Sequence, residues 1–306
     1  MSALAVSAPD AARTAKPPRK SPQLGWVFGT VWLAVLSICA LFANQLPFIR
    51  TYDAKLKIGG KARQYSFGPG WTAWLGTDNS SHDVFARCIY GARQTLTIGI
   101  GATIIGLTVG GLLGVLAGYY RGWVDRVVSI VVDCLLAMPA LLLALLLIQR
   151  ADQIKDSITA LGFLTRTEEI TITLGILAIA PFARIVRAQT LALRERDFVL
   201  AARSLGAKSR RVIWREIMPN LVPAMVTVAV TGLGILIAAE GTLAFLGLGV
   251  PRPQTWGTMI DAARDDLKKA WWATIFPCLF LFLTVLSFNF IGDRLARKFD
   301  IREAAV

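Results

Sequence analysis

The sequence predicts an all-α integral membrane protein with six transmembrane helices. Of its 306 residues 55% are apolar, and the mean hydropathy is +0.55, which is too high for a typical water-soluble domain. Several stretches of about 20 residues or more carry no charge, and such stretches cross a bilayer as helices because lipid offers the backbone no hydrogen-bond partner. Outside these stretches, no segment is long enough to fold alone.

The first elements are a tail, one span and a long loop. Residues 1–25 are rich in Ala, Pro, Ser and Lys, a composition that predicts a disordered, cytoplasmic tail. The first span lies in the uncharged run 21–49, which is too long for a removable signal peptide. Together with the external loop that follows, this span makes residues 26–93 the first unit.

Residues 94–306 form the second predicted unit, which holds the remaining five helices. Its helices are expected near residues 94–120, 126–149, 168–186, 217–239 and 270–292. The second of these is interrupted only by Asp133, and the third is the weakest because its uncharged run covers only residues 170–183. In the first, glycines recur every four residues, which predicts either close packing between helices or, as the alternative, a dimer or gate surface; they are Gly106, Gly110, Gly114 and Gly118.

The distribution of charge predicts the orientation. With the N-terminus inside, the cytoplasmic pieces hold 19 of the 33 basic and 9 of the 20 acidic residues. This bias follows the positive-inside rule, and it places both termini in the cytoplasm. The net charge of +13 is therefore mainly a topology signal, and a nucleic-acid partner is not expected.

Residues 197–220 form a basic, amphipathic segment between two spans. Its first apolar residues are spaced as on one helix face; they are Phe198, Ala201, Ala202 and Leu205. Gly206 breaks this pattern, and a second short helix carrying Val212, Ile213 and Ile217 is expected to end at Pro219. Two short helices joined at a glycine are suited to insertion into a groove of another protein.

This segment resembles the signature of the inner-membrane permeases of binding-protein-dependent ABC importers. That signature is Glu-Ala-Ala, three residues, Gly, and a Pro about thirteen residues later. Here Leu200 replaces the leading Glu, Ala201 and Ala202 follow, and Gly206 and Pro219 stand at the expected spacing.

Four further stretches resemble the dipeptide, oligopeptide and nickel branch of these permeases, and its C-type subunit in particular. They follow one another along the chain, at residues 75–93 (LGTDNSSHDVFARCIYGAR), 118–139 (GYYRGWVDRVVSIVVDCLLAMP), 240–259 (EGTLAFLGLGVPRPQTWGTM) and 288–302 (FNFIGDRLARKFDIR). The chain departs from the branch at Ser81 and His82, at Ala244 and at Ile301.

The resemblance implies a type I ABC importer permease fold and a prokaryotic inner-membrane location. It implies three kinds of partner: a homologous B-type permease, two ATP-binding subunits and an extracytoplasmic solute-binding protein. ATP and Mg would be bound by the partners, and this chain would bind no cofactor. The residues implied to couple the chain to the ATPase are Leu200, Ala201, Ala202, Ser204, Leu205, Gly206, Ala207 and Arg210.

A second group of residues is expected at the translocation path or its external mouth. Asp133 lies inside a span, where an uncompensated charge costs roughly 2.5–3.5 kcal/mol, so it is expected to face protein or water and to be paired. After Glu240 the chain is apolar but too rich in glycine to cross the membrane, so it is expected to fold back against the bundle. The residues assigned to the mouth are Glu240, Phe245, Leu246 and Gly247.

Other functions are less consistent with the sequence. The sequence has no G-x-x-x-x-G-K-[ST] loop, which is the motif that binds nucleotide phosphates. Its single histidine, His82, lies in an expected external loop, so a Ser/His/Asp catalytic site is not indicated. The neighbouring Asp78 and Asp83 are interpreted as solvated charges rather than as a metal site. An enzyme is therefore not expected. A stand-alone channel or secondary transporter remains an alternative, although matched internal repeats are not evident. Peptides are the expected substrate, with nickel chelates, opines or another small solute as alternatives.

Overall fold

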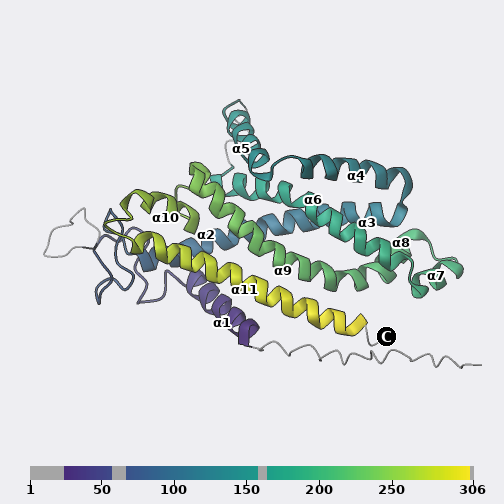
Figure 1. Cartoon of the computed structure of the whole chain (residues 1–306), viewed down its shortest axis with the longest axis horizontal. Helices are drawn as coiled ribbons and strands as arrows, with labels where there is room; N and C mark the ends of the chain where they lie inside the picture. Colours follow the sequence, from purple (N-terminus) through teal and green to yellow (C-terminus); the bar gives the residue numbers. More distant parts are fainter. Residues whose placement is uncertain (1–23, 57–66, 158–163, 304–306) are drawn as a thin grey trace, which may run out of the picture.

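The computed structural model describes residues 24–56, 67–157 and 164–303, and its helices lie side by side in one elongated bundle (Figure 1). The predicted tail falls outside these residues except for its last two positions. The helices are α1 Leu24–Leu41, α2 Val84–Ile105, α3 Gly111–Tyr120, α4 Gly122–Ala137, α5 Ala140–Ser157, α6 Arg166–Arg194, α7 Asp197–Ser204, α8 Ser209–Arg211, α9 Met218–Leu243, α10 Trp256–Ala263 and α11 Trp272–Glu303.

Five helical stretches among the described residues are long and apolar enough to cross a membrane. Two of them join several helices: α2 continues through a π-helical turn into α3, and α8 continues through another into α9. The weakest predicted span is confirmed, since α6 is a continuous helix of 29 residues. It is also the most buried of the five, packed against α2, α3, α4, α5 and α9. The prediction of an all-helical membrane protein is thus confirmed.

The predicted span over residues 126–149 is wrong as a single helix. The chain there forms α4 and α5, which meet at an angle of 95°. Met138 has extended backbone angles (φ −83°, ψ 137°) and precedes Pro139, whose ring disfavours helical geometry at the preceding residue. The two helices count as one crossing only if the bent pair spans the membrane together.

The glycine stripe of the second span packs against α6 of the same chain. A Cβ on Gly110 would lie 2.5 Å from the carbonyl oxygen of Ile179, and one on Gly114 would lie 2.6 Å from that of Ala183. No side chain fits at such distances, so glycine allows the two backbones to touch. The prediction of close packing between helices is therefore confirmed for this face, which is covered by α6.

The two ends of the bundle differ in construction (Figure 1). At one end, called the α7 end here, lie α7, α8, the turn between α3 and α4, and the C-terminal end of α11. At the other, the α10 end, lie α10 and the loop between α1 and α2. The segments predicted to share the cytoplasmic side thus lie at one end.

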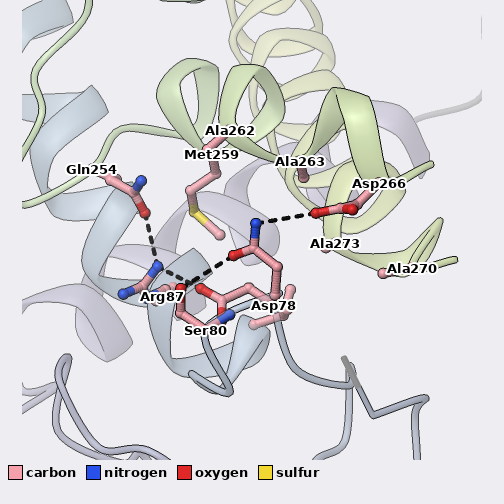
Figure 2. A pocket seen from close by; sticks show the side chains of 12 residues that line it. Asp78, Ser80, Arg87, Gln254, Met259, Ala262, Ala263, Asp266, Ala270 and Ala273 are labelled. Atoms are coloured by element: carbon pink, nitrogen blue, oxygen red, sulfur yellow. Dashed lines mark hydrogen bonds and ion pairs between the residues drawn. The ribbon is translucent and has the colours of Figure 1, made fainter. Parts of the chain in front are cut away.

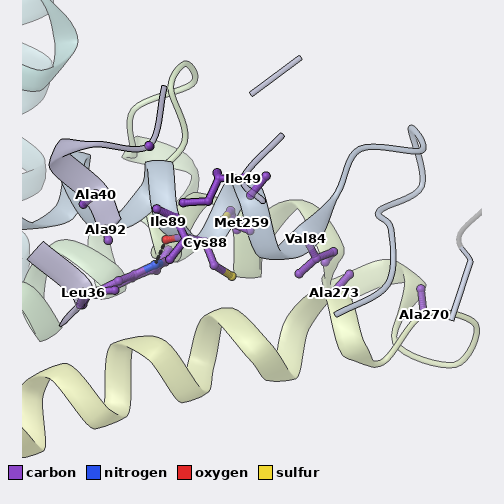
Figure 3. Packing of buried hydrophobic residues seen from close by; sticks show 14 residues of the cluster. Leu36, Ala40, Ile49, Val84, Cys88, Ile89, Ala92, Met259, Ala270 and Ala273 are labelled. Carbon is purple, nitrogen blue, oxygen red and sulfur yellow. Dashed lines mark hydrogen bonds between the residues drawn. The ribbon is translucent and has the colours of Figure 1, made fainter. Parts of the chain in front are cut away.

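The α10 end is held together by an apolar cluster that joins α1, α2, α10 and α11 (Figure 3). Trp256 is fully buried at its centre and donates a hydrogen bond from Nε1 to the carbonyl oxygen of Cys88 at 2.9 Å. Gly257 lies so close to α9 that a Cβ there would be 2.8 Å from the Cα of Gly241. The prediction that the chain folds back against the bundle after Glu240 is confirmed.

Candidate functional sites at the two ends of the bundle

The turn at Gly206 fixes the shape of the predicted coupling segment. The amide of Gly206 donates to the carbonyl of Arg203 at 2.9 Å, and the amide of Ala207 donates to that of Ala202 at 3.1 Å. This pair of bonds is a Schellman motif, which requires a left-handed residue at the position of Gly206, where φ is +79°. The predicted helix break is confirmed, and α7 and α8 are set at a defined angle.

The segment is anchored to the bundle by residues that sequence reasoning did not select. Val199 is fully buried in a cluster with Val115, Val186, Val212 and Ile217, which joins α7 to three spans. The guanidinium of Arg203 stacks on the ring of Tyr119, 4.9 Å from its centroid. A single buried valine in an otherwise exposed helix gives no distinctive sequence pattern, so these anchors emerge only from the tertiary structure.

The opposite face of α7 is not covered by any of the residues that the structure describes. Leu205 is 89% exposed, and Phe198, Leu200, Ala201 and Ser204 are exposed as well. Ala202 and Ala207 are half-buried, and Arg210 is exposed on α8. Apolar side chains that stay exposed on a rigidly anchored helix mark a surface for another protein.

Pro219 does not end the second helix, contrary to the prediction. Helix runs from Ser209 to Leu246, where Gly247 interrupts it with a φ of +80°, and Pro219 lies in the first turn of α9. The π-helical turn Val212–Ile217 widens the helix just before the proline, where its missing N–H and its ring would otherwise disrupt an α-helix. The coupling segment is therefore continuous with a helix that reaches the other end of the bundle.

Asp133 lies on the exposed surface of α4, and no hydrogen bond or ion pair holds it among the described residues. The expected bond to a neighbouring helix is not formed in this chain, because the available cation, Arg187 of α6, is bound by Asp125. That pair is bidentate, with Nη2 2.8 Å from Oδ2. Asp133 therefore interacts with Arg187 only over a longer distance and presents its carboxylate at the surface of α4.

Glu240 is enclosed at the α10 end of α9 and is only 1% exposed. Among the described residues neither carboxylate oxygen has a hydrogen-bond partner of standard geometry, although the Thr255 side chain lies close by. The expectation that Glu240 lines an open mouth is therefore not met in this conformation. Phe245, Leu246 and Gly247, in the turn that follows α9, are exposed and remain candidates.

A cavity of about 210 Å³ opens at the α10 end, between the start of α2 and α10 (Figure 2). Its polar wall is an ordered network: Arg87 Nη1 donates to Asp78 at 2.6 Å and to Gln254 at 3.2 Å, while Asn79 donates to Asp266 at 3.0 Å. Its floor is apolar and includes Val84, Met259 and four alanines.

The residues around His82 are buried and bonded, so the interpretation of solvated charges was wrong. His82 is 7% exposed and shares the Asp78 carboxylate, with its Nδ1 3.2 Å away. Burial, together with the nearby Arg87, lowers the pKa of His82 despite the opposing effect of Asp78. Asp83 caps α2 by accepting from the amide of Phe85 at 2.9 Å. Among the described residues, no three His, Cys, Asp or Glu side chains group as metal ligands would.

Comparison with known families decides the identity of this architecture. Residues 110–302 match the family described as the binding-protein-dependent transport system inner membrane component. The chain belongs to this family. It is 37% identical over 234 residues to the glutathione transport system permease protein GsiD of Pectobacterium atrosepticum, covering 76% of this chain and 74% of that protein. It is 36% identical over 234 residues to the dipeptide transport system permease protein DppC of Alkalihalophilus pseudofirmus, covering 76% and 73%.

Solved structures confirm the permease fold. An inward-facing structure of the MetNI methionine ABC transporter matches with a TM-score of 0.58 and 19% identity, over 72% of this chain and 99% of that one. A crystal structure of an amino acid ABC transporter matches with a TM-score of 0.54 and 18% identity, over 70% and 94%. At these identities the match concerns the fold alone, and it confirms the type I importer permease fold predicted from the sequence.

In this permease, the two predicted groups of site residues lie at opposite ends of the bundle. The coupling residues lie at the α7 end, and the exposed mouth residues lie at the α10 end (Figure 1). The helix that runs from Ser209 to Leu246 connects them directly and, at about 1.5 Å per residue, is roughly 60 Å long. The two ends of the bundle are therefore joined by one helical stretch of the chain.

Proposed function

We propose that this permease is the C-type subunit of an ATP-driven peptide importer. It would pair with a homologous B-type permease, two ATP-binding subunits that hold ATP and Mg, and an extracytoplasmic solute-binding protein. The relatives named for glutathione and dipeptide transport support a peptide substrate. Nickel chelates and opines remain alternative substrates, because importers of these solutes share the sequence motifs that indicate this branch of the family.

The observation that carries the proposal is the anchored but uncovered face of α7. Val199 fixes the helix to the spans, while Leu205 and its exposed neighbours are free to enter a groove of an ATP-binding subunit. Closure of the two ATP-binding subunits would move α7, and the rigid turn at Gly206 would pass that movement to α9. The contacts between α7 and the ATP-binding subunit would differ between the inward- and outward-open states of the permease, and this difference would shift the equilibrium between them.

This assignment orients the protein in the membrane. The α7 end would face the cytoplasm with both termini, in keeping with the positive charge predicted for that side. The α10 end would face outward, so the 210 Å³ cavity and the exposed residues Phe245 and Leu246 would meet the solute-binding protein.

The test is co-expression with candidate permease, ATP-binding and solute-binding subunits, followed by affinity purification through this chain and a peptide uptake assay. An importer subunit brings down ATP-binding chains, and uptake requires ATP. A stand-alone channel or secondary transporter would purify without them and would transport solute without ATP. Replacement of Leu205 by Glu serves as the matched variant, because it should abolish co-purification without disturbing a buried residue.

A further inference from the structure

A second hollow lies at the α7 end, on the outer face of the helix that leads into α9. It has a volume of about 550 Å³ and is lined by Lys208, Arg210, Arg211, Trp214 and Arg215. None of these four cations forms an ion pair among the described residues, and Glu216, the acidic residue of the same turn, does not line the hollow. Four uncompensated positive charges around one hollow call for an anionic ligand.

The position of the hollow along the helix indicates where that ligand comes from. Arg215 is exposed near the end of the π-helical turn, and Val222 and Val226, further along the same helix, are exposed as well. The exposed surface of the helix thus changes from basic to apolar within about two turns. Such a change is expected where a helix passes from the aqueous phase into lipid.

Trp214 supports the same placement. It is 60% exposed although it is the largest apolar side chain of the turn, whereas Val212, Ile213 and Ile217 on the opposite side are buried in the bundle. A tryptophan with an exposed ring and a free N–H is typical of the interface between lipid and water. By contrast, the exposed face of α7, which we assign to the ATP-binding subunit, consists mainly of apolar and small residues.

We propose that this hollow binds the headgroup phosphate of an anionic phospholipid. Arg211 and Arg215 would hold the phosphate, Lys208 would add charge, and Trp214 would lie against the glycerol and the upper acyl chains. All five lining residues lie within the segment 197–220, and Arg210 is one of the predicted coupling residues, so the proposal rests on Arg211, Trp214 and Arg215. It does not depend on the peptide substrate or on the ATPase assignment.

Native mass spectrometry of the full chain tests the proposal. The purified protein in detergent is mixed with equal amounts of phosphatidylglycerol and phosphatidylcholine, and the lipid retained on the protein is counted. We expect one phosphatidylglycerol to be retained in preference to phosphatidylcholine. The double variant Arg211→Gln/Arg215→Gln should weaken its binding by about tenfold or more, since each basic residue near an anionic lipid surface contributes about 1 kcal/mol.

A matched control separates a site from a diffuse positive surface. Arg297→Gln/Lys298→Gln removes the same charge from two exposed residues of α11 at the same end of the bundle, and it should leave lipid retention unchanged. Equal loss in both variants, or no loss in the first, would overturn the proposal. Circular dichroism and size exclusion should show that both variants remain folded, which the exposure of all four side chains predicts.

Two further arms distinguish other sources of the anion. Millimolar inorganic phosphate should not displace the lipid, because the acyl chains contribute to binding. Displacement of the lipid would show that the hollow binds a soluble phosphate instead. Assembly with the ATP-binding subunits should leave the phosphatidylglycerol in place. If assembly expels it, the hollow is a protein interface and the lipid assignment is wrong.

Discussion

Replacement of Gly206 by valine should uncouple transport from ATP hydrolysis. Gly206 has φ +79°, and no atom lies within 4 Å of a Cβ built there, so the substitution acts through the backbone and not through a clash within this chain. The left-handed conformation costs a non-glycine residue about 1–2 kcal/mol, and a β-branched residue lies at the upper end of that range. Since 1.4 kcal/mol is tenfold, about 2 kcal/mol lowers the equilibrium constant for forming the turn by roughly 30-fold.

The assay is ATP-driven peptide uptake in proteoliposomes that contain the assembled complex, with ATP hydrolysis measured in parallel. We expect uptake by the Gly206→Val complex to fall at least tenfold while hydrolysis continues. Gly206→Asn should retain most of the uptake, because asparagine tolerates the left-handed region. Gly122→Val is the matched control: Gly122 also has a positive φ (+64°) with open space around it, but it lies in the turn between α3 and α4.

Two outcomes would refute this reasoning. If Gly206→Val supports uptake at the wild-type rate, the Schellman turn is not needed to transmit movement. If Gly122→Val impairs uptake to the same degree, the loss reflects a general effect of strained turns and not the coupling segment.

Three further predictions concern single side chains. Leu200→Glu restores the residue typical of the family. It should weaken association with the ATP-binding subunits about tenfold or more, because an unpaired carboxylate at an interface costs about 1–3 kcal/mol. If a pull-down titration shows tighter association instead, the groove of the ATP-binding subunit is suited to Glu at this position. Glu240→Leu should raise the thermal unfolding temperature of the detergent-solubilised protein, since it removes a buried carboxyl without partners, whereas Glu240→Gln should gain little; a lower unfolding temperature for the leucine variant would contradict this. The lowered pKa of His82 means that the folded state favours the neutral ring. The contribution of His82 to the free energy of unfolding should therefore be constant above about pH 6.5 and should fall as the pH drops below that value. In His82→Gln this loss of stability at acid pH should be smaller, and an unchanged pH profile would show that other groups cause the loss.

The features that could be predicted from the sequence are those determined by neighbouring residues. The break at Gly206 follows from the position of a glycine after a helix-period pattern, and the close contact of α3 with α6 follows from glycines repeated every four residues. Uncharged runs located five of the spans, because length and hydropathy largely determine whether a helix can cross a bilayer, but they missed the charged helix ends: the second span begins at Val84 and not near residue 94.

The features that could not be predicted depend on distant parts of the chain. The network around Arg87 joins Asp78 to Gln254, which lies 167 residues further along the chain from Arg87, so His82 and its neighbours looked like residues of a solvated loop. The burial of Glu240 depends on α10 folding back over α9. The bend at Met138 is different: the following proline was visible in the sequence, but the apolar run around it favoured one continuous span.

The central claim is that α7 is the contact between this permease and an ATP-binding subunit. It is tested most directly by placing a photoreactive amino acid at Leu205 and irradiating membranes that contain the whole complex. We expect a crosslinked product that contains an ATP-binding chain, and no such product when the same amino acid replaces Val222, which is exposed on α9. A complex that remains active in transport but gives no product at Leu205, or gives it equally at Val222, would contradict the claim.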